Sequence, residues 1–276
     1  MTTTAKERID VLLVERGFYE SREKAKAALM AGLVLVNDEP VDKSGMKVAR
    51  TADIKVKGAL HPYVSRGGLK LEKAIRTFGI DLNGRVMLDI GASTGGFTDC
   101  ALQNGASYVY AIDVGYNQLD WSLRQDERVH VMERTNFRYT QPADLIGPQP
   151  TFASIDVSFI SLKHILPALS TLLSLGSGIV ALIKPQFEAG REKVGKSGVV
   201  RDSAVHRDVL RKVLTTAAEL GYSLQDITFS PITGGEGNIE FLAYWAWSAE
   251  PNALIPNDAS LAELVKQANE TFTTNK

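Results

Sequence analysis

The sequence predicts an α/β fold, with helices on both faces of a mostly parallel sheet, preceded by a small α+β domain. From residue 66 onward, short apolar segments alternate with helical stretches, which is the pattern of βαβ units. Before residue 60, two short amphipathic helices are followed by a hairpin. We therefore divide the chain into a small domain at 1–60, a linker at 61–64, a large domain at 65–250 and a tail with a short helix at 251–276.

The small domain begins with two predicted helices joined by a turn. In the first helix, apolar residues from Ile9 to Leu13 recur at the spacing of one helix face, and Gly17 is a typical helix stop. Ser21 is a typical N-cap of the second helix, and Gly32 ends it. These signals predict a helix pair at the start of the chain.

A hairpin and one further strand complete the small domain. Apolar residues between Val34 and Val41 flank a turn at Asn37-Asp38, a sequence typical of tight hairpins. Asp53–Val56 is the further strand, and the stretch from Gly58 to Pro62 has the composition of a linker.

The large domain is predicted to contain seven strands. Five short apolar runs are expected as its first strands: Val86–Gly91, Tyr108–Asp113, Val129–Met132, Phe152–Ile155 and Ile179–Ile183. Leu224–Phe229 and Ile239–Trp247 complete the sheet. In the tail, the stretch from Ser260 to Glu263 matches a capping box, which predicts a helix from that point.

Composition argues against a disulfide-stabilised protein, a cysteine-built zinc site and a membrane-spanning protein. The net charge is −1, and the excess of cations in the first 60 residues is too small to indicate nucleic-acid binding. Because Cys100 is the single cysteine, neither an intrachain disulfide nor a zinc site built from cysteines is expected. We find neither the ~20-residue apolar run of a membrane-spanning helix nor the apolar core of a signal peptide. The sequence therefore predicts a cytoplasmic protein.

A glycine-rich turn after the first large-domain strand predicts a cofactor site. Glycines let the backbone approach a ligand, and Asp113, which ends the next strand, lies 22 residues beyond Gly91, where a carboxylate can bind the ribose of an adenosine-containing cofactor. Ser93 occupies the second glycine position of dinucleotide sites, which favours S-adenosylmethionine because it has no pyrophosphate. The alternative is a turn that needs glycine only for packing. The expected cofactor-binding residues are Asp89, Gly91, Ser93, Thr94, Gly95, Gly96, Asp113 and Asn136.

Charged residues at strand ends predict a second cluster. Asp156 and Lys184 each follow an apolar strand, and Glu240 begins the last one. Open α/β sheets place their ligands at the carboxyl ends of strands, and buried charges there need partners. These side chains therefore form either a catalytic cluster or an ion-pair network that only holds the strands together.

Four motifs resemble those of the haemolysin A (TlyA) family of ribosomal RNA 2′-O-methyltransferases. They are Ser65-Arg-Gly-Gly-Leu-Lys70, Asp89-Ile-Gly-Ala-Ser-Thr-Gly-Gly-Phe97, Asp156-Val-Ser-Phe-Ile-Ser161 and Ile183-Lys-Pro-Gln-Phe-Glu188. The stretches Arg8–Leu13 and Gly32–Asn37 look like the RNA-binding module of ribosomal protein S-four, and the catalytic part is similar to FtsJ-type enzymes. The resemblance covers residues 6–247 and implies a Rossmann-like class I methyltransferase fold.

The family's catalytic tetrad falls on Lys70, Asp156, Lys184 and Glu240. Only the resemblance identifies Lys70, because by pattern alone it is one more lysine of a helix. The family implies that Lys184 acts as general base on the ribose 2′-hydroxyl. Neighbouring carboxylates oppose the loss of a proton by that lysine, whereas burial and a second lysine favour it. Lys184 as a base and Lys184 as a charged residue that orients the hydroxyl both remain open.

Cations of both domains are candidate RNA contacts. They are Lys6, Arg8, Arg22 and Lys43 in the small domain and Arg134, Arg138 and Lys193 in the large one. Each could equally be a solvated surface charge. The stretch Gly190–Gly198 combines glycines with three cations, which favours a mobile loop that closes over RNA, with an ordinary connector as the alternative.

The resemblance implies ribosomal RNA or ribosomal subunits as partner, cytidine ribose as target, and neither a metal nor a membrane. Two other classes of function are alternatives. One is a non-enzymatic RNA-binding or ribosome-assembly protein, which the complete tetrad and cofactor turn oppose. The other is a membrane-acting haemolysin, for which the sequence offers no strongly amphipathic Lys-rich helix. The sequence does not identify the ribosomal subunit that is modified or the oligomeric state.

Overall fold

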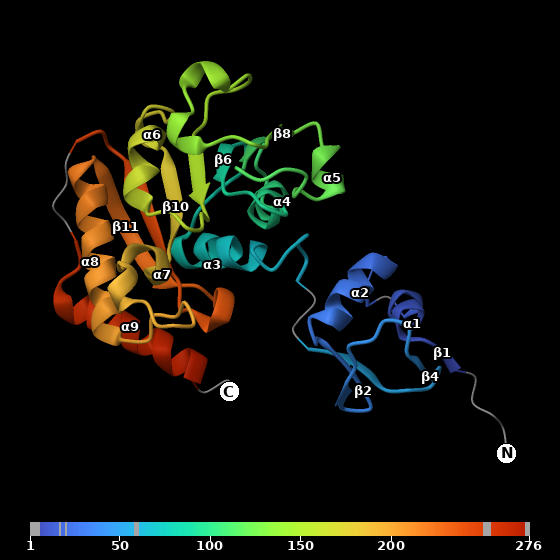
Figure 1. The fold of residues 1–276 in the computed structure, drawn as a ribbon. Helices are drawn as coiled ribbons and strands as arrows, with labels where there is room; N and C mark the ends of the chain where they lie inside the picture. Colours follow the sequence, from blue (N-terminus) through green and yellow to red (C-terminus); the bar gives the residue numbers. More distant parts are fainter. Residues whose placement is uncertain (1–5, 17, 20, 58–60, 251–254, 274–276) are drawn as a thin grey trace. The chain divides into compact units, whose positions relative to one another are not determined.

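The computed structural model describes residues 6–16, 18–19, 21–57, 61–250 and 255–273. The chain forms two compact units, residues 1–62 and 63–276 (Figure 1). The predicted helix stop at Gly17 and the first residues of the predicted linker, 58–60, lie outside the described residues.

The first unit packs two helices against short antiparallel strands. Its elements are β1 (Lys6–Arg8), α1 (Ile9–Glu15), α2 (Arg22–Met30), β2 (Val34–Val36), β3 (Glu39–Pro40), β4 (Lys47–Ala49) and β5 (Ile54–Val56). Three strands pair in the order β3-β2-β5, and β1 pairs with β4. Ile9, Leu13 and Leu29 are fully buried in its core.

The local signals of the first unit are confirmed. The Ser21 hydroxyl accepts a hydrogen bond from the backbone N–H of Lys24 at 3.3 Å, as an N-cap does. Asn37 and Asp38 have φ of 52° and 67°, the left-handed values of a tight hairpin turn. The β1–β4 pair was not predicted, because three-residue strands with charged side chains carry no apolar alternation.

The second unit is built on a seven-stranded sheet. Its strands are β6 (Val86–Ile90), β7 (Tyr108–Ile112), β8 (Val129–Met132), β9 (Phe152–Ile155), β10 (Gly178–Ile183), β11 (Tyr222–Phe229) and β12 (Phe241–Trp247). They follow the order β11-β12-β10-β9-β6-β7-β8. The strand β12 is antiparallel to both of its neighbours, β10 and β11, and the other four strand pairs of this sheet are parallel. The predicted mostly parallel sheet is confirmed.

Helices cover both faces of the sheet. The α-helices are α3 (Gly68–Phe78), α4 (Gly96–Gln103), α5 (Trp121–Arg124), α6 (Leu166–Ser170), α7 (Pro185–Glu188), α8 (Ser203–Glu219) and α9 (Asp258–Thr273). The 3-10 helices are η1 (Phe137–Tyr139), η2 (Pro142–Asp144), η3 (Leu162–His164), η4 (Arg191–Lys193) and η5 (Gly235–Gly237). Leu88 of β6 lies in one core with α6, α8 and α9, and Met87 lies in the other with α3 and α4. Successive side chains of one strand thus enter opposite cores.

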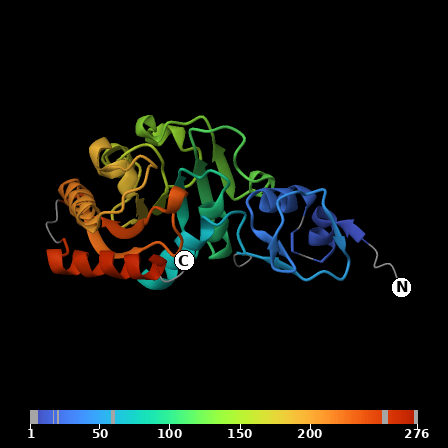
Figure 2. The same ribbon diagram turned by 60° about the horizontal axis from the view of Figure 1, so that its bottom comes forward.

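The C-terminal helix begins earlier than the sequence predicted. The Asn257 side chain accepts hydrogen bonds from the backbone N–H and the hydroxyl of Ser260, at 2.9 and 3.1 Å, so Asn257 occupies the capping position assigned to Ser260. The helix α9 spans 16 residues and lies beside α8 in both views (Figure 1 and Figure 2). Among the described residues, no helix combines the length and the apolar character needed to cross a membrane.

Candidate active site

The turn between β6 and α4 requires glycine at two positions. Gly91 has φ +87°, and a Cβ atom there would lie 2.5 Å from the carbonyl oxygen of Asp156. Gly95 has φ +98°, and its Cβ would lie 2.3 Å from the side chain of Leu123. A side chain at either position would therefore push the turn away from the end of β9 or from α5.

Asp89 lies beneath this turn and not on its surface. Its side chain is fully buried, and the hydroxyls of Thr98 and Ser154 donate to its two carboxylate oxygens at 2.6 and 3.0 Å. Burial raises the pKa of Asp89 to about 6, although both hydroxyls oppose the shift. The sequence placed Asp89 among the residues that contact the cofactor. In the structure the carboxylate is enclosed and ties α4 to β9, and its contact with the cofactor stays a prediction.

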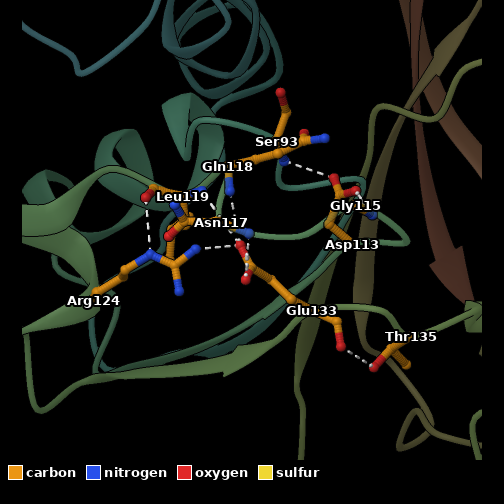
Figure 3. Close-up of polar contacts among 9 residues, drawn as sticks. All are labelled: Ser93, Asp113, Gly115, Asn117, Gln118, Leu119, Arg124, Glu133 and Thr135. Atoms are coloured by element: carbon orange, nitrogen blue, oxygen red, sulfur yellow. Dashed lines mark hydrogen bonds and ion pairs between the residues drawn. The ribbon is translucent and has the colours of Figure 1, made fainter.

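Asp113 and Ser93 meet on the open side of the turn (Figure 3). One carboxylate oxygen of Asp113 accepts the backbone N–H of Ser93 at 2.8 Å, and the other accepts that of Gly115 at 2.7 Å. A carboxylate oxygen can accept two hydrogen bonds, so each retains one acceptor site. The side chain of Asn136 lies further along the chain, where it accepts two hydrogen bonds from Arg138 and caps η1.

Four charged side chains from distant parts of the chain form one network. Asp156 directly follows β9, Lys184 directly follows β10, and Glu240 directly precedes β12. Because β12 is antiparallel, its first residue lies at the edge where β9 and β10 end. Lys70 of α3 completes the network, with its Nζ 3.2 Å from Asp156 and 2.8 Å from Glu240. The Nζ of Lys184 lies 2.5 Å from the other oxygen of Asp156.

The two lysines of this network differ in their partners. Lys70 contacts two carboxylates, which raise its pKa although burial opposes the shift. Burial alone would raise the pKa of Asp156, but the two lysines outweigh it and lower the pKa. Lys184 contacts only one carboxylate, and its Nζ lies 3.2 Å from the hydroxyl of Ser158. Lys70 is therefore the fixed cation of the network.

An exposed phenylalanine that packs on Phe187 was not predicted from the sequence. Phe159 is 90% exposed and has φ +64°, a backbone conformation that is uncommon for a bulky residue. Its ring lies 5.1 Å from that of Phe187, and the Nζ of Lys184 lies 5.9 Å from the Phe187 ring. Nothing in the sequence distinguishes Phe159 from a core residue, because its exposure depends on how the loop after β9 is held. Strained residues of this kind cluster at functional sites.

A basic groove of about 940 Å³ extends from these aromatic rings. Five of its lining residues are basic: Arg138, Lys163, His164, Arg191 and Lys196. No carboxylate is among the lining residues. Arg138 was predicted as an RNA contact, whereas Lys163 and His164 of η3 were not, because two adjacent basic residues carry no distinctive pattern and only the fold brings them to the groove.

Glu188 connects the two segments that carry the aromatic rings. Its buried carboxylate accepts the hydroxyl of Ser161 at 2.6 Å and the backbone N–H of Leu162 at 2.7 Å. Burial raises the pKa of Glu188 although both hydrogen bonds oppose it. The loop that follows β9 is thus fixed to the end of α7. This role could not be predicted from the sequence, since burial of the glutamate depends on contacts made 26 residues away.

In the first unit, a buried aspartate orients two of the predicted RNA-binding arginines. The carboxylate of Asp10 is fully buried and forms ion pairs with Arg8 at 2.9 Å and Arg22 at 2.8 Å. The two arginine side chains are 41% and 47% exposed. Lys6 and Lys43 are also exposed, on β1 and on the loop before β4. The structure thus brings Arg8 and Arg22 together on the surface.

The other predicted RNA contacts are engaged locally. The guanidinium of Arg134 lies 4.0 Å from the centre of the Tyr116 ring, and that of Arg138 lies 5.3 Å from the Tyr139 ring. Lys193 forms an ion pair with Asp208 at 3.6 Å. Of these, Arg138 is the one that lines the basic groove.

We expect the stability gained from Asp10 to disappear in acid. The two arginines lower the pKa of Asp10 to about 2, from an ordinary value of 3.8. A lowered pKa contributes stability that is present above pH ~4 and is lost as the pH falls toward 2. Because both arginines are partly solvated, we expect only about 1 kcal/mol. Asp10→Asn should therefore lower the melting temperature of the full chain at pH 5 but not at pH 2.

The control for this measurement is Asp42→Asn, which changes an exposed carboxylate of the same unit. It should leave the melting temperature near the wild-type value at both pH values. A difference between wild type and Asp10→Asn that is the same at pH 5 and pH 2 would contradict the role given to the Asp10 carboxylate.

Two family profiles match this chain, one on each side of the boundary between its structural units. The sequence profile of the FtsJ-like methyltransferases matches residues 63–246, and that of the S4 domain matches residues 7–54. The structural units meet at residue 62. Each profile therefore falls within one unit.

Several relatives extend over nearly the whole chain. A protein of Bacillus subtilis, provisionally named an rRNA methyltransferase, is 57% identical over 99% of this chain and 98% of the relative. The 16S/23S rRNA (cytidine-2′-O)-methyltransferase TlyA of Mycobacterium tuberculosis is 43% identical over 87% of this chain and 88% of the relative. A solved structure from Streptococcus thermophilus, provisionally called a hemolysin, is 52% identical, covers 99% of both chains and superposes with a TM-score of 0.80.

Proposed function

This chain belongs to the FtsJ-like methyltransferase family, and we propose on that basis that it methylates the ribose 2′-hydroxyl of a cytidine in ribosomal RNA. The observation that carries the proposal is the network of Lys70, Asp156, Lys184 and Glu240. It lies beside the glycine turn, where Gly91 closely approaches Asp156. The relative from M. tuberculosis is named for cytidine 2′-O-methylation of 16S and 23S rRNA, and the S4 domain supports RNA as the partner.

The methyl donor is S-adenosylmethionine, and the residues of the glycine turn fit it. Both oxygens of Asp113 keep an acceptor site for ribose hydroxyls beside the backbone of Ser93. Ser93 occupies the position where dinucleotide sites need glycine for a pyrophosphate. When bound, the donor supplies a methyl group on a sulfonium, which needs no further activation. The turn and Asp113 therefore have only to hold and orient it.

Removing the Asp113 carboxylate should weaken binding of the methyl donor. Asp113→Ala is expected to cost about 1–3 kcal/mol of binding free energy, the range for hydrogen bonds to a charged group. Calorimetry with S-adenosylmethionine measures it. Asp144→Ala, which changes an exposed carboxylate of η2, is the control and should bind as wild type does. Equal affinity of Asp113→Ala and wild type for S-adenosylmethionine would show that the cofactor binds elsewhere.

We assign the proton transfer to Lys184. The new bond joins the ribose oxygen to the methyl carbon while the bond from sulfur to that carbon breaks, and the hydroxyl proton passes to the Nζ of Lys184. Lys184 has one carboxylate partner and a contact with the Ser158 hydroxyl, whereas Lys70 is held by two carboxylates, so we assign the transfer to the lysine that is less enclosed by ion pairs. Asp156 contacts both lysines and positions Lys184.

The groove and the exposed phenylalanine support an unpaired nucleotide as the substrate. Phe159 is 90% exposed and its ring packs on Phe187, the ring that Lys184 approaches, so it offers a base a surface to stack on. The basic lining of the groove, with no carboxylate, suits the phosphates on either side of that nucleotide. Bases stack on aromatic residues only when they leave a helix, so we infer a target that is single-stranded or flipped out of its duplex.

Phe159→Ala should lower kcat/KM for ribosomal RNA. Stacking of one base on an aromatic ring contributes about 1–3 kcal/mol, so we expect a loss of about tenfold or more. Affinity for S-adenosylmethionine should not change. Ile146→Ala removes another exposed apolar side chain, one that does not line the groove, and should have no effect. An unchanged kcat/KM for Phe159→Ala would show that the substrate base does not stack on Phe159.

The proposed function is tested by mapping 2′-O-methyl groups in ribosomal RNA from cells with and without this gene. At least one cytidine should lose its methyl group in the deletion strain and regain it with the wild-type gene. Complementation with Lys184→Ala should not restore it. Identical methylation in both strains would instead favour a non-enzymatic protein that binds RNA.

A further inference from the structure

A glutamate outside the predicted site holds a loop of the second unit in place. Glu133 directly follows β8, and its side chain is 9% exposed. Its carboxylate accepts the backbone N–H groups of Asn117, Gln118 and Leu119 at 2.8, 3.0 and 3.5 Å (Figure 3). Three consecutive amides thus converge on one carboxylate. This arrangement fixes the loop from a residue 14 to 16 positions away in the chain.

Arg124 completes the arrangement from the other side. Its guanidinium forms an ion pair with Glu133, and its Nε donates to the carbonyl oxygen of Leu119 at 3.0 Å. Burial alone would raise the pKa of Glu133, but the three amides and Arg124 outweigh it and lower the pKa to about 2. Glu133 is therefore ionised at every pH at which the protein works. Its charge satisfies groups that would otherwise lack an acceptor.

The loop held by Glu133 supports the glycine turn directly. The backbone N–H of Asp120 donates to the carbonyl oxygen of Thr94 at 3.0 Å. A Cβ atom on Gly95 would lie 2.8 Å from the buried side chain of Leu119, so the turn rests on Leu119. Displacing residues 117–120 would therefore remove both a hydrogen bond and a packing surface from the turn.

The residues that follow β8 also hold Asp113 in place through backbone hydrogen bonds. The backbone N–H of Thr135 donates to the carbonyl oxygen of Asp113, and that of Arg134 donates to Gly115, each at 2.9 Å. The segment that follows β8 therefore holds both walls of the proposed cofactor site. Backbone hydrogen bonds hold the wall that contains Asp113. The Glu133 side chain holds residues 117–119, which support the wall formed by the glycine turn.

We propose that Glu133 is a positioning residue for S-adenosylmethionine, acting through residues 117–120 on the glycine turn. The proposal rests on the proposed function only in placing the methyl donor at that turn. Glu133 does not have to touch the donor, because its carboxylate is occupied by Asn117, Gln118, Leu119 and Arg124. Its effect is on donor affinity and not on the methyl-transfer step.

The decisive variant is Glu133→Gln, which keeps the size of the side chain but replaces one acceptor oxygen by an NH₂ donor. That group would face backbone N–H groups, so the loop must move. We expect the Kd for S-adenosylmethionine to rise by about 10- to 100-fold, as small displacements of binding groups produce. The KM for the donor should rise in parallel, while kcat at saturating donor and the Kd for ribosomal RNA stay near wild type.

Two further variants separate positioning from general stability. Asp126→Asn disrupts a neighbouring carboxylate–arginine pair, Asp126 with Arg128 at 2.7 Å, and should leave donor affinity unchanged. Leu119→Ala keeps the contacts of Glu133 but removes packing under Gly95, and should raise the Kd by a smaller factor.

The proposal is overturned if Glu133→Gln melts at a lower temperature but binds the donor as wild type does. Should Glu133→Gln fail to fold, wild-type affinity in Leu119→Ala overturns it instead. If S-adenosylmethionine bound elsewhere, Asp113→Ala would also bind it with wild-type affinity. That result distinguishes failure of the proposed cofactor site from failure of the Glu133 proposal.

Discussion

Lys184→Ala should lower the single-turnover rate of ribosomal RNA methylation by about 10²- to 10⁴-fold, the usual contribution of a general base. Folding should survive the change. Asp156 keeps Lys70 at 3.2 Å and Glu240 keeps it at 2.8 Å, so neither carboxylate loses its last cationic partner. RNA affinity should stay close to wild type, because Lys184 is buried and contributes little to the charged surface. Rapid-quench methylation assays and thermal melts of the same variants measure both quantities.

Lys184→Arg separates catalysis from ion pairing. A guanidinium keeps its positive charge but does not release a proton at any working pH, so this variant should also be inactive. Lys266→Ala removes a lysine from an exposed ion pair with Glu263 and serves as the control with full activity. If Lys184→Arg were active, the network would be a structural ion-pair cluster, or Lys184 would only orient the hydroxyl as a cation.

Removing residues 1–62 should reduce methylation of ribosomal RNA by about 10²-fold or more at low RNA concentration. Tethering two binding modules raises the overall affinity by about 10²- to 10⁴-fold, and the truncated protein loses that gain. The second unit has two cores of its own, so residues 63–276 should still fold. Calorimetry should give the same affinity for S-adenosylmethionine as in the full chain.

The full chain with Lys6→Ala and Lys43→Ala, which changes two exposed lysines of the first unit, tests the same idea without deletion. It should lose part of the methylation rate at low RNA concentration and recover it at high concentration, since only binding is affected. A truncated protein as active as the full chain at low RNA concentration would show that the S4 unit is dispensable for substrate capture.

The sheet could be predicted from the sequence because parallel strands buried on both faces are continuous apolar runs. Val86–Ile90 and Gly178–Ile183 are examples in which every residue is buried. The β1–β4 pair was missed for the opposite reason, since Lys6–Arg8 and Lys47–Ala49 have little apolar character. The start of α9 was misplaced because two capping signals, Asn257 and Ser260, compete within four residues.

The residues of the charged network and its surroundings divide in the same way. Asp156, Lys184 and Glu240 could be found because charges beside apolar strands are conspicuous, whereas Lys70 needed a family resemblance. The full burial of Asp89 could not be predicted, because sequence position cannot tell whether a strand residue faces the cofactor or the core. Glu133, Glu188 and Phe159 acquire their roles from contacts distant in sequence, which no local pattern encodes.

The position of β12 in the sheet sets the order in which the protein matures during synthesis. Among the described strands, β11 hydrogen-bonds with β12, and β10 has β12 on its outer side. While residues 241–247 are still being synthesised, β11 has no partner strand and one edge of β10 is unpaired. These unpaired edges can form non-native strand pairs. Glu240 arrives with that same strand, after Lys70, Asp156 and Lys184. A nascent chain that has passed Lys184 but not Glu240 therefore holds three of the four residues of the charged network and completes it only with β12.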